Sequence, residues 1–343
     1  MHTAESYNTV RTEAMERIKT REGSQGDLQE CRPFDEPPRD NPGDEQTRSR
    51  IPKRIIQIWI DLRRHGSHRS ADSCPETPRP TRRGSARGDL PLLCSASMAN
   101  ARLLNPNFEY MFFDDKAVEA FIQSTFPQYK DAFYAFKYPI QRCDFFRYLA
   151  VFHYGGFYLD LDVFLVSELT NLLQHACVFS FEELTLNKFL RNDHGLDWEV
   201  GNYAFGAEAG NPFIGEVIKN CVRAQTDRQW VKEIMNGIPR MFHKDFYILN
   251  TTGPGLVSRT LAENPRTAEG VTILLPDDMR DKRMWHCFGE FGIHLAQNGW
   301  RDNPSFFYRR SFVLWMWWNR RALLKNGPRA RRIGPSITSG WTR

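Results

Sequence analysis

The 343-residue sequence predicts an α/β fold, because segments of strand composition alternate with segments of helical periodicity along most of the chain. Hydrophobic residues make up 41% of the chain and charged residues 25%, which supports a folded body with a large core. These figures exclude a collagen, a coiled coil, a disulfide miniprotein and a wholly disordered chain. At roughly 100–200 residues per domain, the length allows one large domain or two smaller ones.

The alternation of strands and helices begins at residue 51. Residues 51–60 end in the apolar run Ile-Ile-Gln-Ile-Trp-Ile, which is typical of a buried strand. Residues 142–154 form a helix candidate, and Gly155-Gly156 closes it. The other candidates are helices over 95–104, 117–126 with an extension over 132–138, and 211–228, and strands over 108–113, 157–159 continued by 163–166, 178–181 and 271–275.

Three parts of the chain depart from this pattern. Residues 1–50 are polar and proline-rich, and we expect them to be disordered. Residues 63–90 are rich in Arg, Ser, Pro and Gly, so they are either a disordered insertion or an error in the gene model. The folded domain is therefore expected over residues 51–310, followed at 311–343 by a Trp-rich segment and a basic tail.

The Trp-rich segment is apolar over residues 312–318, which is too short to span a membrane. We favour a final buried helix or strand here. The alternative is an element at a membrane surface, with Trp and Arg side chains at headgroup depth. No apolar run typical of a secretory signal opens the chain, so a soluble or peripheral protein is the expectation from the residues alone.

The positive charge lies mainly at the end of the chain. The formal net charge is +5, and residues 320–343 contain seven basic residues and no acidic ones. A nucleic-acid-binding protein concentrates its charge on the folded body, so this distribution disfavours a nucleic-acid partner. The seven cysteines show no zinc-ligand spacing, and Cys143 is expected to serve packing.

Two carboxylates, Asp160 and Asp162, follow the predicted strand at 157–159. At positions i and i+2 they share one face of an extended strand. The carboxyl end of a strand is where open α/β sheets bind ligands. Adjacent carboxylates repel unless a cation lies between them, and a hard divalent ion that also binds phosphate oxygens is the natural occupant. A solvated strand end or a turn is the alternative.

Asp144 and Arg147 lie three residues apart and share one face of the preceding helix. A surface ion pair, worth about 0–1 kcal/mol, is the simplest interpretation of such a pair. However, the helix leads through Gly155-Gly156 into the acidic strand end. We therefore expect both pairs of residues to face one crevice.

These motifs resemble the DXD sugar-binding region of glycosyltransferase family 32, which includes fungal α-1,6-mannosyltransferases and inositol-phosphoceramide mannosyltransferases. The resemblance covers about residues 51–60 and 92–301. The blocks that carry it are Ile51 to Trp59, Asp144-x-x-Arg147-Tyr148, Gly155-Gly156-x-Tyr158-Leu159-Asp160-x-Asp162, Asn202-x-Ala204-Phe-Gly206, Thr252-Gly-Pro254 and His294 to Trp300.

The resemblance implies a GT-A fold, in which helices flank a mixed central sheet. It implies a retaining, metal-dependent transfer of a hexose from a nucleotide sugar to a glycan or sphingolipid acceptor. GDP-mannose or a UDP-hexose would be the donor, and mannose is favoured. The resemblance also implies a place in the Golgi or secretory pathway. Separately, the basic residues from Arg320 to Arg332 after the Trp-rich run fit a lipid-facing acceptor or peripheral contact with a membrane surface.

The resemblance further implies a role for each site residue. Asp160 and Asp162 would hold Mn²⁺ or Mg²⁺ together with the donor diphosphate, and His294 would be a further metal or phosphate contact. Asp144 and Arg147 would contact the donor sugar or its phosphate. The other expected donor contacts are Trp59 at the nucleotide base, Trp300 at the β-phosphate side, and Asn202.

Several points stay open from the sequence. A double displacement would need a carboxylate nucleophile. Glu182 and Glu183 are candidates, although surface positions are the simpler expectation for them. The alternatives to a transferase are a catalytically silent relative that binds a nucleotide sugar or a partner, and an unrelated Mg²⁺-dependent phosphohydrolase.

Overall fold

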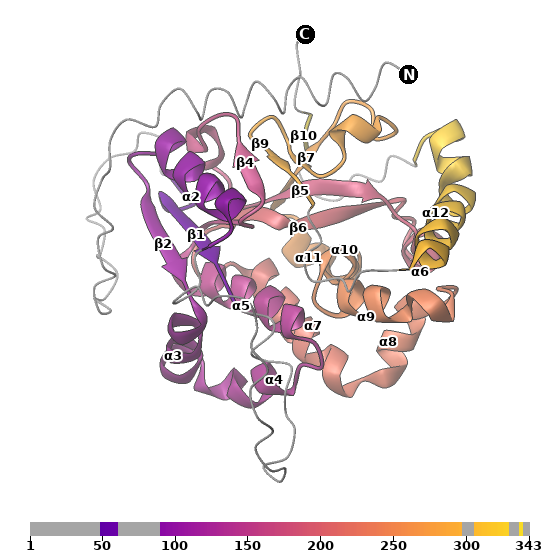
Figure 1. Cartoon of the computed structure of the whole chain (residues 1–343), viewed down its shortest axis with the longest axis horizontal. Helices are drawn as coiled ribbons and strands as arrows, with labels where there is room; N and C mark the ends of the chain where they lie inside the picture. The colour runs from indigo at the N-terminus through magenta and orange to yellow at the C-terminus, as the bar shows by residue number, and fades with distance from the viewer. Residues whose placement is uncertain (1–48, 61–89, 297–304, 329–335, 339–343) are drawn as a thin grey trace, which may run out of the picture. The chain divides into compact units, whose positions relative to one another are not determined.

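The computed structural model describes residues 49–60, 90–296 and 305–328, together with the backbone of 336–338 (Figure 1). Several predictions from the sequence fall outside these residues. They concern the segment 1–48, the insertion over 63–89, Trp300 and most of the tail after residue 328.

A seven-stranded mixed sheet forms the centre of the fold (Figure 1). Its strands are β1 (Arg54–Ile58), β2 (Glu109–Phe113), β3 (Gly156–Leu159), β5 (Cys177–Leu184), β6 (Trp198–Ala207), β7 (Val271–Leu275) and β10 (Ser336–Thr338). They lie in the order β10-β7-β5-β6-β3-β1-β2. Only β6 runs antiparallel to its neighbours, β3 and β5, among these described strands. The predicted α/β fold with a mixed central sheet is confirmed.

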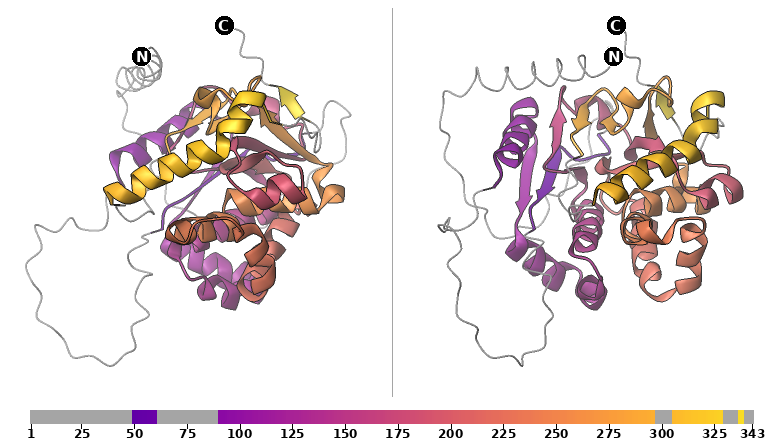
Figure 2. Two further views of the ribbon diagram at one scale, coloured as in Figure 1. Left: turned by 90° about the vertical axis from the view of Figure 1, so that its right-hand side faces the viewer. Right: turned by 45° about the vertical axis from the view of Figure 1, so that its right-hand side comes forward.

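Helices cover both faces of this sheet (Figures 1 and 2). They are α2 (Leu92–Leu104), α3 (Asp115–Thr125), α4 (Lys130–Ala135), α5 (Pro139–Tyr154), α6 (Lys188–Asp193), α7 (Pro212–Thr226), α8 (Arg228–Met235), α9 (His243–Thr251), α10 (Pro254–Glu263), α11 (Pro265–Ala268) and α12 (Phe306–Asn326). The larger buried cluster lies between the sheet and α5, α7 and α10, and includes Phe145 and Phe146. A second cluster joins the opposite face of the sheet to α2 through Ala101.

A second, three-stranded sheet corrects one prediction from the sequence. Its strands are β4 (Val163–Leu165), β8 (Cys287–Phe288) and β9 (Gly292–His294), in the order β4-β9-β8. Residues 163–166 therefore do not continue β3, because the chain turns between the two sheets. The amide of Val163 donates to the carbonyl of Asp160 at 3.0 Å, so Asp160 and Asp162 lie on a turn and not on an extended strand.

Local capping sets the ends of the helices near the site. Pro139 opens α5, and the side chain of Gln141 accepts from the amide of Tyr138. The helix ends at Gly155, whose φ of +64° favours glycine. The predicted extension over 132–138 is wrong, since a 3₁₀ turn separates α3 from the short α4.

The Trp-rich segment forms the long helix α12. The expectation that it is buried is wrong, because Arg320 is its only buried residue and Trp317 and Trp318 are 57% and 59% exposed. The opposite side of α12 packs through Phe312 on a small cluster around Phe242. Among the described residues, no helix combines the length and apolar character needed to cross a membrane.

Replacing Gly156 tests the turn that leads into β3. Gly156→Ala should lower the free energy of unfolding by about 3 kcal/mol, because its φ of +102° is strained for alanine and its Cβ would lie 2.7 Å from the carbonyl oxygen of Arg54. Gly210→Ala is the matched control. Its φ is +70° but no atom lies within 4 Å of an added Cβ, so it should cost only about 1–2 kcal/mol. Equal losses in chemical denaturation would contradict this account.

Candidate functional site

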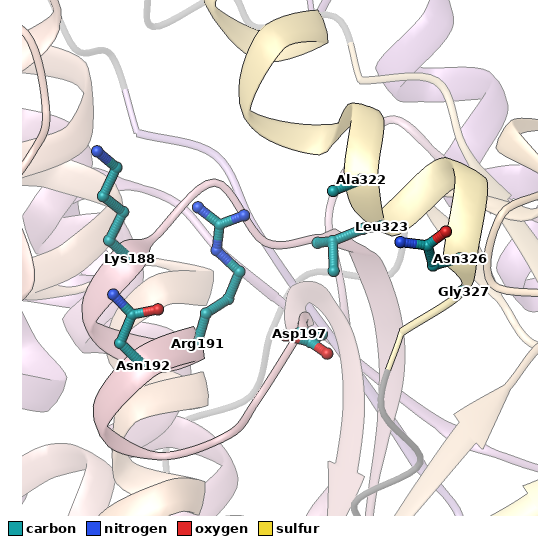
Figure 3. A pocket seen from close by; sticks show the side chains of 8 residues that line it. All are labelled: Lys188, Arg191, Asn192, Asp197, Ala322, Leu323, Asn326 and Gly327. Atoms are coloured by element: carbon teal, nitrogen blue, oxygen red, sulfur yellow. The ribbon is translucent and has the colours of Figure 1, made fainter.

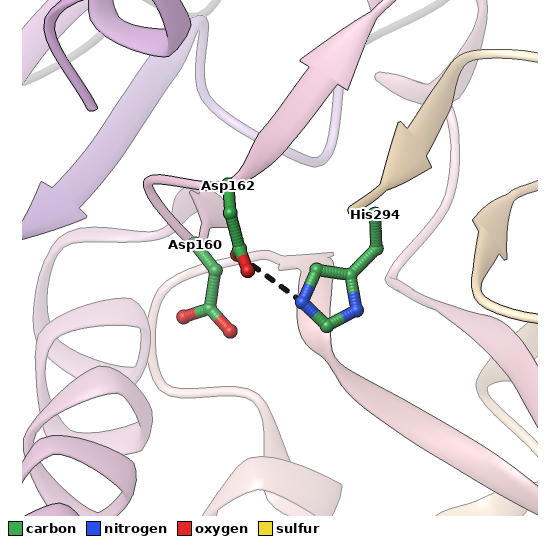
Figure 4. A group of neighbouring side chains, drawn as sticks. All are labelled: Asp160, Asp162 and His294. Atoms are coloured by element: carbon green, nitrogen blue, oxygen red, sulfur yellow. Dashed lines mark ion pairs between the residues drawn. The ribbon is translucent and has the colours of Figure 1, made fainter. Parts of the chain in front are cut away.

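Three potential metal ligands converge where the two sheets meet (Figure 4). One ligand atom each from Asp160, Asp162 and His294 lies within 4.8 Å of the others. Asp160 and Asp162 come from the turn after β3, and His294 ends β9. Because β4 pairs with β9, Val163 lies opposite His294, and the small sheet thereby brings the imidazole to the acidic turn. The family resemblance predicted that these three residues act together, and the structure places them side by side.

The three side chains remain accessible. Asp160 is 25% exposed, Asp162 18% and His294 15%. Nε2 of His294 lies 3.1 Å from Oδ1 of Asp162. Two carboxylates and one imidazole form a donor set that suits Mn²⁺, and a set rich in carboxylates also suits Mg²⁺. The residues present therefore fit a divalent ion.

The carboxylate of Asp160 is held by two side chains. The hydroxyl of Tyr158 donates to its Oδ1 at 2.5 Å, and Nη1 of Arg147 lies 3.2 Å from the same atom. Burial raises the pKa of Asp160 above its ordinary value; Arg147 opposes this shift and the neighbouring charge of Asp162 adds to it. A cation beside the two carboxylates would relieve their repulsion.

Asp144 and Arg147 form a buried ion pair beneath Asp160. Their side chains are 7% and 5% exposed, and Oδ1 of Asp144 lies 2.9 Å from Nη2 of Arg147. The interpretation as a surface pair is therefore wrong. Arg147 reaches from this partner to Asp160, so one guanidinium connects both carboxylates that the sequence singled out. Arg147 thus lies between Asp144 and the accessible Asp160, and the expected contact of Asp144 and Arg147 with a donor stays a prediction.

Side chains from two other elements complete this network. Nη1 of Arg147 donates to the carbonyl of Asn202 on β6 at 2.7 Å, and the amide of Asn202 donates to Asp144 at 3.3 Å. The hydroxyl of Thr252, which follows α9, donates to Asp144 at 2.8 Å. Asn202 and Thr252 are thus parts of one buried network.

Trp59 lies at the same edge of the sheet as Asp160. It follows β1, which runs parallel to β3 with Ile56 beside Tyr158, and both chains leave the sheet in the same direction. Trp59 is partly exposed there, and its amide donates to the carbonyl of Phe113. The expected contact of Trp59 with a nucleotide base stays a prediction.

Sequence analysis missed two aromatic residues of the site. The ring of Tyr203 on β6 stacks on His294, with centroids 4.3 Å apart and an interplanar angle of 15°. Nothing in the local sequence of Tyr203 indicates this contact, which depends on the pairing of distant strands. Tyr158, by contrast, precedes Asp160 by two residues, and that spacing could have indicated the contact.

Glu182 and Glu183, the candidate nucleophiles, are engaged in ion pairs. Oε1 of Glu182 lies 3.1 Å from Nδ1 of His286, and Glu183 pairs with Arg320 of α12. Burial would raise the pKa of Glu182, but His286, His294 and Arg320 together lower it below its ordinary value. The pKa of His286 in turn rises to about 9, because Glu182 outweighs the effect of burial.

A pocket lies apart from this site, between α6 and the end of α12 (Figure 3). None of its lining residues belongs to the acidic turn or to the buried network. They are Lys188, Arg191, Asn192, Asp197, Ala322, Leu323, Asn326 and Gly327.

Residues 91–179 match the family described as "Glycosyltransferase sugar-binding region containing DXD motif". This segment contains Asp144, Arg147, Asp160 and Asp162, but not His294. This segment is therefore similar to a DXD-containing sugar-binding region of glycosyltransferases, which confirms the resemblance that the sequence predicted for it.

Named fungal proteins share this similarity. Two are from Saccharomyces cerevisiae: mannosyl phosphorylinositol ceramide synthase CSH1, 31% identical over 52% of this chain and 42% of its own length, and mannosyl phosphorylinositol ceramide synthase SUR1, 31% identical over 45% and 34%. The initiation-specific alpha-1,6-mannosyltransferase of Candida albicans is 23% identical over 53% of this chain and 49% of its own. The matches thus span less than half the length of each relative.

Removing the charge of Asp144 tests the buried network. Asp144→Asn should lower the free energy of unfolding by about 3 kcal/mol, because it breaks a buried ion pair. Glu216→Gln is the matched control. Glu216 also pairs with a base three residues away, but Lys219 is 66% exposed, so the loss should be at most about 1 kcal/mol. Similar losses in urea titrations would show that the Asp144 pair is not distinctive.

The pH dependence of stability tests Glu199, on β6. Burial raises its pKa from 4.5 to about 7, against the hydrogen bond from Thr185. The folded state then binds the proton of Glu199 more tightly than the unfolded chain does. The contribution of this group to stability is therefore complete below about pH 4.5 and is lost as the pH rises through about 7. Glu199→Gln should therefore stabilise the protein at pH 8 by up to about 3 kcal/mol, with no gain at pH 4. A gain of equal size at both pH values in thermal unfolding would contradict this assignment.

Proposed function

We propose that this chain, whose residues 91–179 match a DXD-containing glycosyltransferase region, transfers a hexose from a nucleotide sugar to a glycan or glycolipid with retention of configuration. GDP-mannose is the favoured donor, because the names of the reported relatives refer to a mannosyl product or to a mannosyltransferase. The acceptor class rests on the same names, which refer to mannosyl phosphorylinositol ceramide and to an initiation-specific mannosyltransferase. The GT-A type of the mixed sheet is part of this proposal.

One observation carries the proposal: His294 joins Asp160 and Asp162, although about 130 residues of chain separate them. The acidic pair lies within the matched glycosyltransferase segment, whereas the histidine comes from outside it. A solvated strand end would not need an imidazole within reach of both carboxylates. The convergence supports a site for a divalent ion and the diphosphate of a donor.

The residues of the chain have distinct parts in this mechanism. Asp160, Asp162 and His294 would hold Mn²⁺ or Mg²⁺, and the ion would neutralise negative charge that develops on the leaving nucleoside diphosphate. Arg147 keeps the carboxylate of Asp160 in place and lowers its affinity for a proton. Tyr203 restricts the orientation of His294 through the stacked rings.

Retention is best served here by attack from the same face as the departing diphosphate. A double displacement would need a free carboxylate beneath the anomeric carbon. Glu182 and Glu183 instead pair with His286 and Arg320. In the proposed route, the acceptor hydroxyl forms the new bond to the anomeric carbon as the bond to the diphosphate breaks. A phosphate oxygen of the leaving group receives the hydroxyl proton.

A donor screen tests the proposed function. The full chain is incubated with Mn²⁺ and GDP-mannose or a UDP-hexose, and release of GDP or UDP is followed. We expect metal-dependent release from one donor. Asp160→Ala/Asp162→Ala should reduce this release at least a hundredfold, roughly the effect of losing a group that stabilises developing charge. His294→Ala should weaken the apparent affinity for Mn²⁺.

Asp278→Ala/Asp281→Ala is the matched control for the double variant. It removes two carboxylates that pair only with neighbouring surface arginines in the described structure, so release should be unchanged. Binding of a nucleotide sugar without release, with or without acceptor, would favour the silent relative. Release of inorganic phosphate would favour the phosphohydrolase.

A further inference from the structure

Helix α12 presents a continuous apolar and cationic face to solvent. Phe306 and Phe307 are 71% and 78% exposed, and Val313 and Leu314 are 57% and 58% exposed. Trp317 and Trp318 continue this face one helical turn further on, since residues three and four apart lie on the same side of a helix. Figure 2 shows α12 along the outside of the fold. Six large apolar side chains on one exposed helix face are more than an ordinary surface carries.

Positive charge accompanies these apolar side chains. Arg309, Arg310, Arg321 and Lys325 are exposed on α12, and the helix contains no acidic residue. The guanidinium of Arg321 lies over the ring of Trp318, 3.4 Å from its centroid. The pocket beside the end of the helix adds the exposed Lys188. An occupant of this face must therefore be apolar in part and negatively charged.

We propose that α12 docks this protein on the surface of an anionic lipid bilayer. Trp and Phe side chains favour the boundary between headgroups and acyl chains, while Arg and Lys side chains bind the lipid phosphates. A second copy of the chain fits this face less well, because two faces of the same positive charge would repel. A helix of this kind lies on the membrane and does not span it.

The inner side of α12 is attached to β5, the strand that carries Glu182 and Glu183. Arg320 is 4% exposed, donates to the carbonyl of Leu184 and pairs with Glu183 on β5. Glu182, the preceding residue, contacts His286, whose ring centroid is 6.2 Å from that of His294. The docking helix and the candidate metal ligands are thus joined by a short chain of contacts. The link between docking and catalysis rests on the proposed function. If that function holds, docking through α12 would bring a glycolipid acceptor to the same side of the protein as the donor.

Vesicle sedimentation of the full chain tests the docking. The vesicles contain phosphatidylcholine alone or with phosphatidylserine. We expect the protein to pellet with the anionic vesicles, and less so as salt is raised. Trp317→Glu/Trp318→Glu should weaken the partition more than about tenfold, because two large side chains lose their apolar contact with the lipid. Leu103→Glu, at a 56% exposed position of α2, is the matched control and should bind as the unaltered protein does.

Each other outcome overturns the proposal. Failure of the unaltered protein to pellet with anionic vesicles would exclude the bilayer as occupant. Equal binding by the double variant would place the contact elsewhere on the chain. Self-association that the double variant abolishes, without vesicle binding, would assign the face to a second copy. Sedimentation requires no turnover, so it can succeed where nucleotide release fails, and the two proposals fail separately.

Discussion

The guanidinium of Arg147 is the constraint on which the site depends. It binds Asp144 on its own helix, Asp160 on the turn after β3 and the carbonyl of Asn202 on β6. Burying such a charge is costly unless several partners surround it. Here two carboxylates and a carbonyl oxygen do so, while Thr252 holds Asp144 from the far side. The position of the accessible carboxylate is therefore coupled to the packing of α5 against the sheet.

The turn between β3 and β4 brings the two carboxylates of the site together with a third side chain. Because the chain leaves the large sheet at Asp160 and enters the small sheet at Val163, the two carboxylates lie at the junction of the sheets. The small sheet then supplies His294 beside them. A carboxylate pair on one continuous strand would lack this third group. The change of sheet is thus what gives the acidic motif a metal-binding arrangement.

Two buried arginines each connect a helix to the strands near the site. Arg147 supports the acidic turn, and Arg320 attaches α12 to β5 through Glu183 and the carbonyl of Leu184. Both guanidinium groups are charged and buried, so removing one of their partners would leave a buried charge without compensation. Between them, Glu182 pairs with His286, whose ring lies next to that of His294. The acids of β5 therefore connect α12 to the site.

The sequence by itself determined the alternation of strands and helices, the acidic pair and the pair on α5, because these follow from local periodicity and short spacing. The burial of Asp144 and Arg147, the stacking of Tyr203 on His294 and the exposure of Trp317 were decided only by tertiary structure. Each depends on residues brought together from distant parts of the chain. The local sequence likewise predicted Asp160 and Asp162 on one extended strand. They lie on a turn instead, because β4 pairs with the distant β9 in a second sheet.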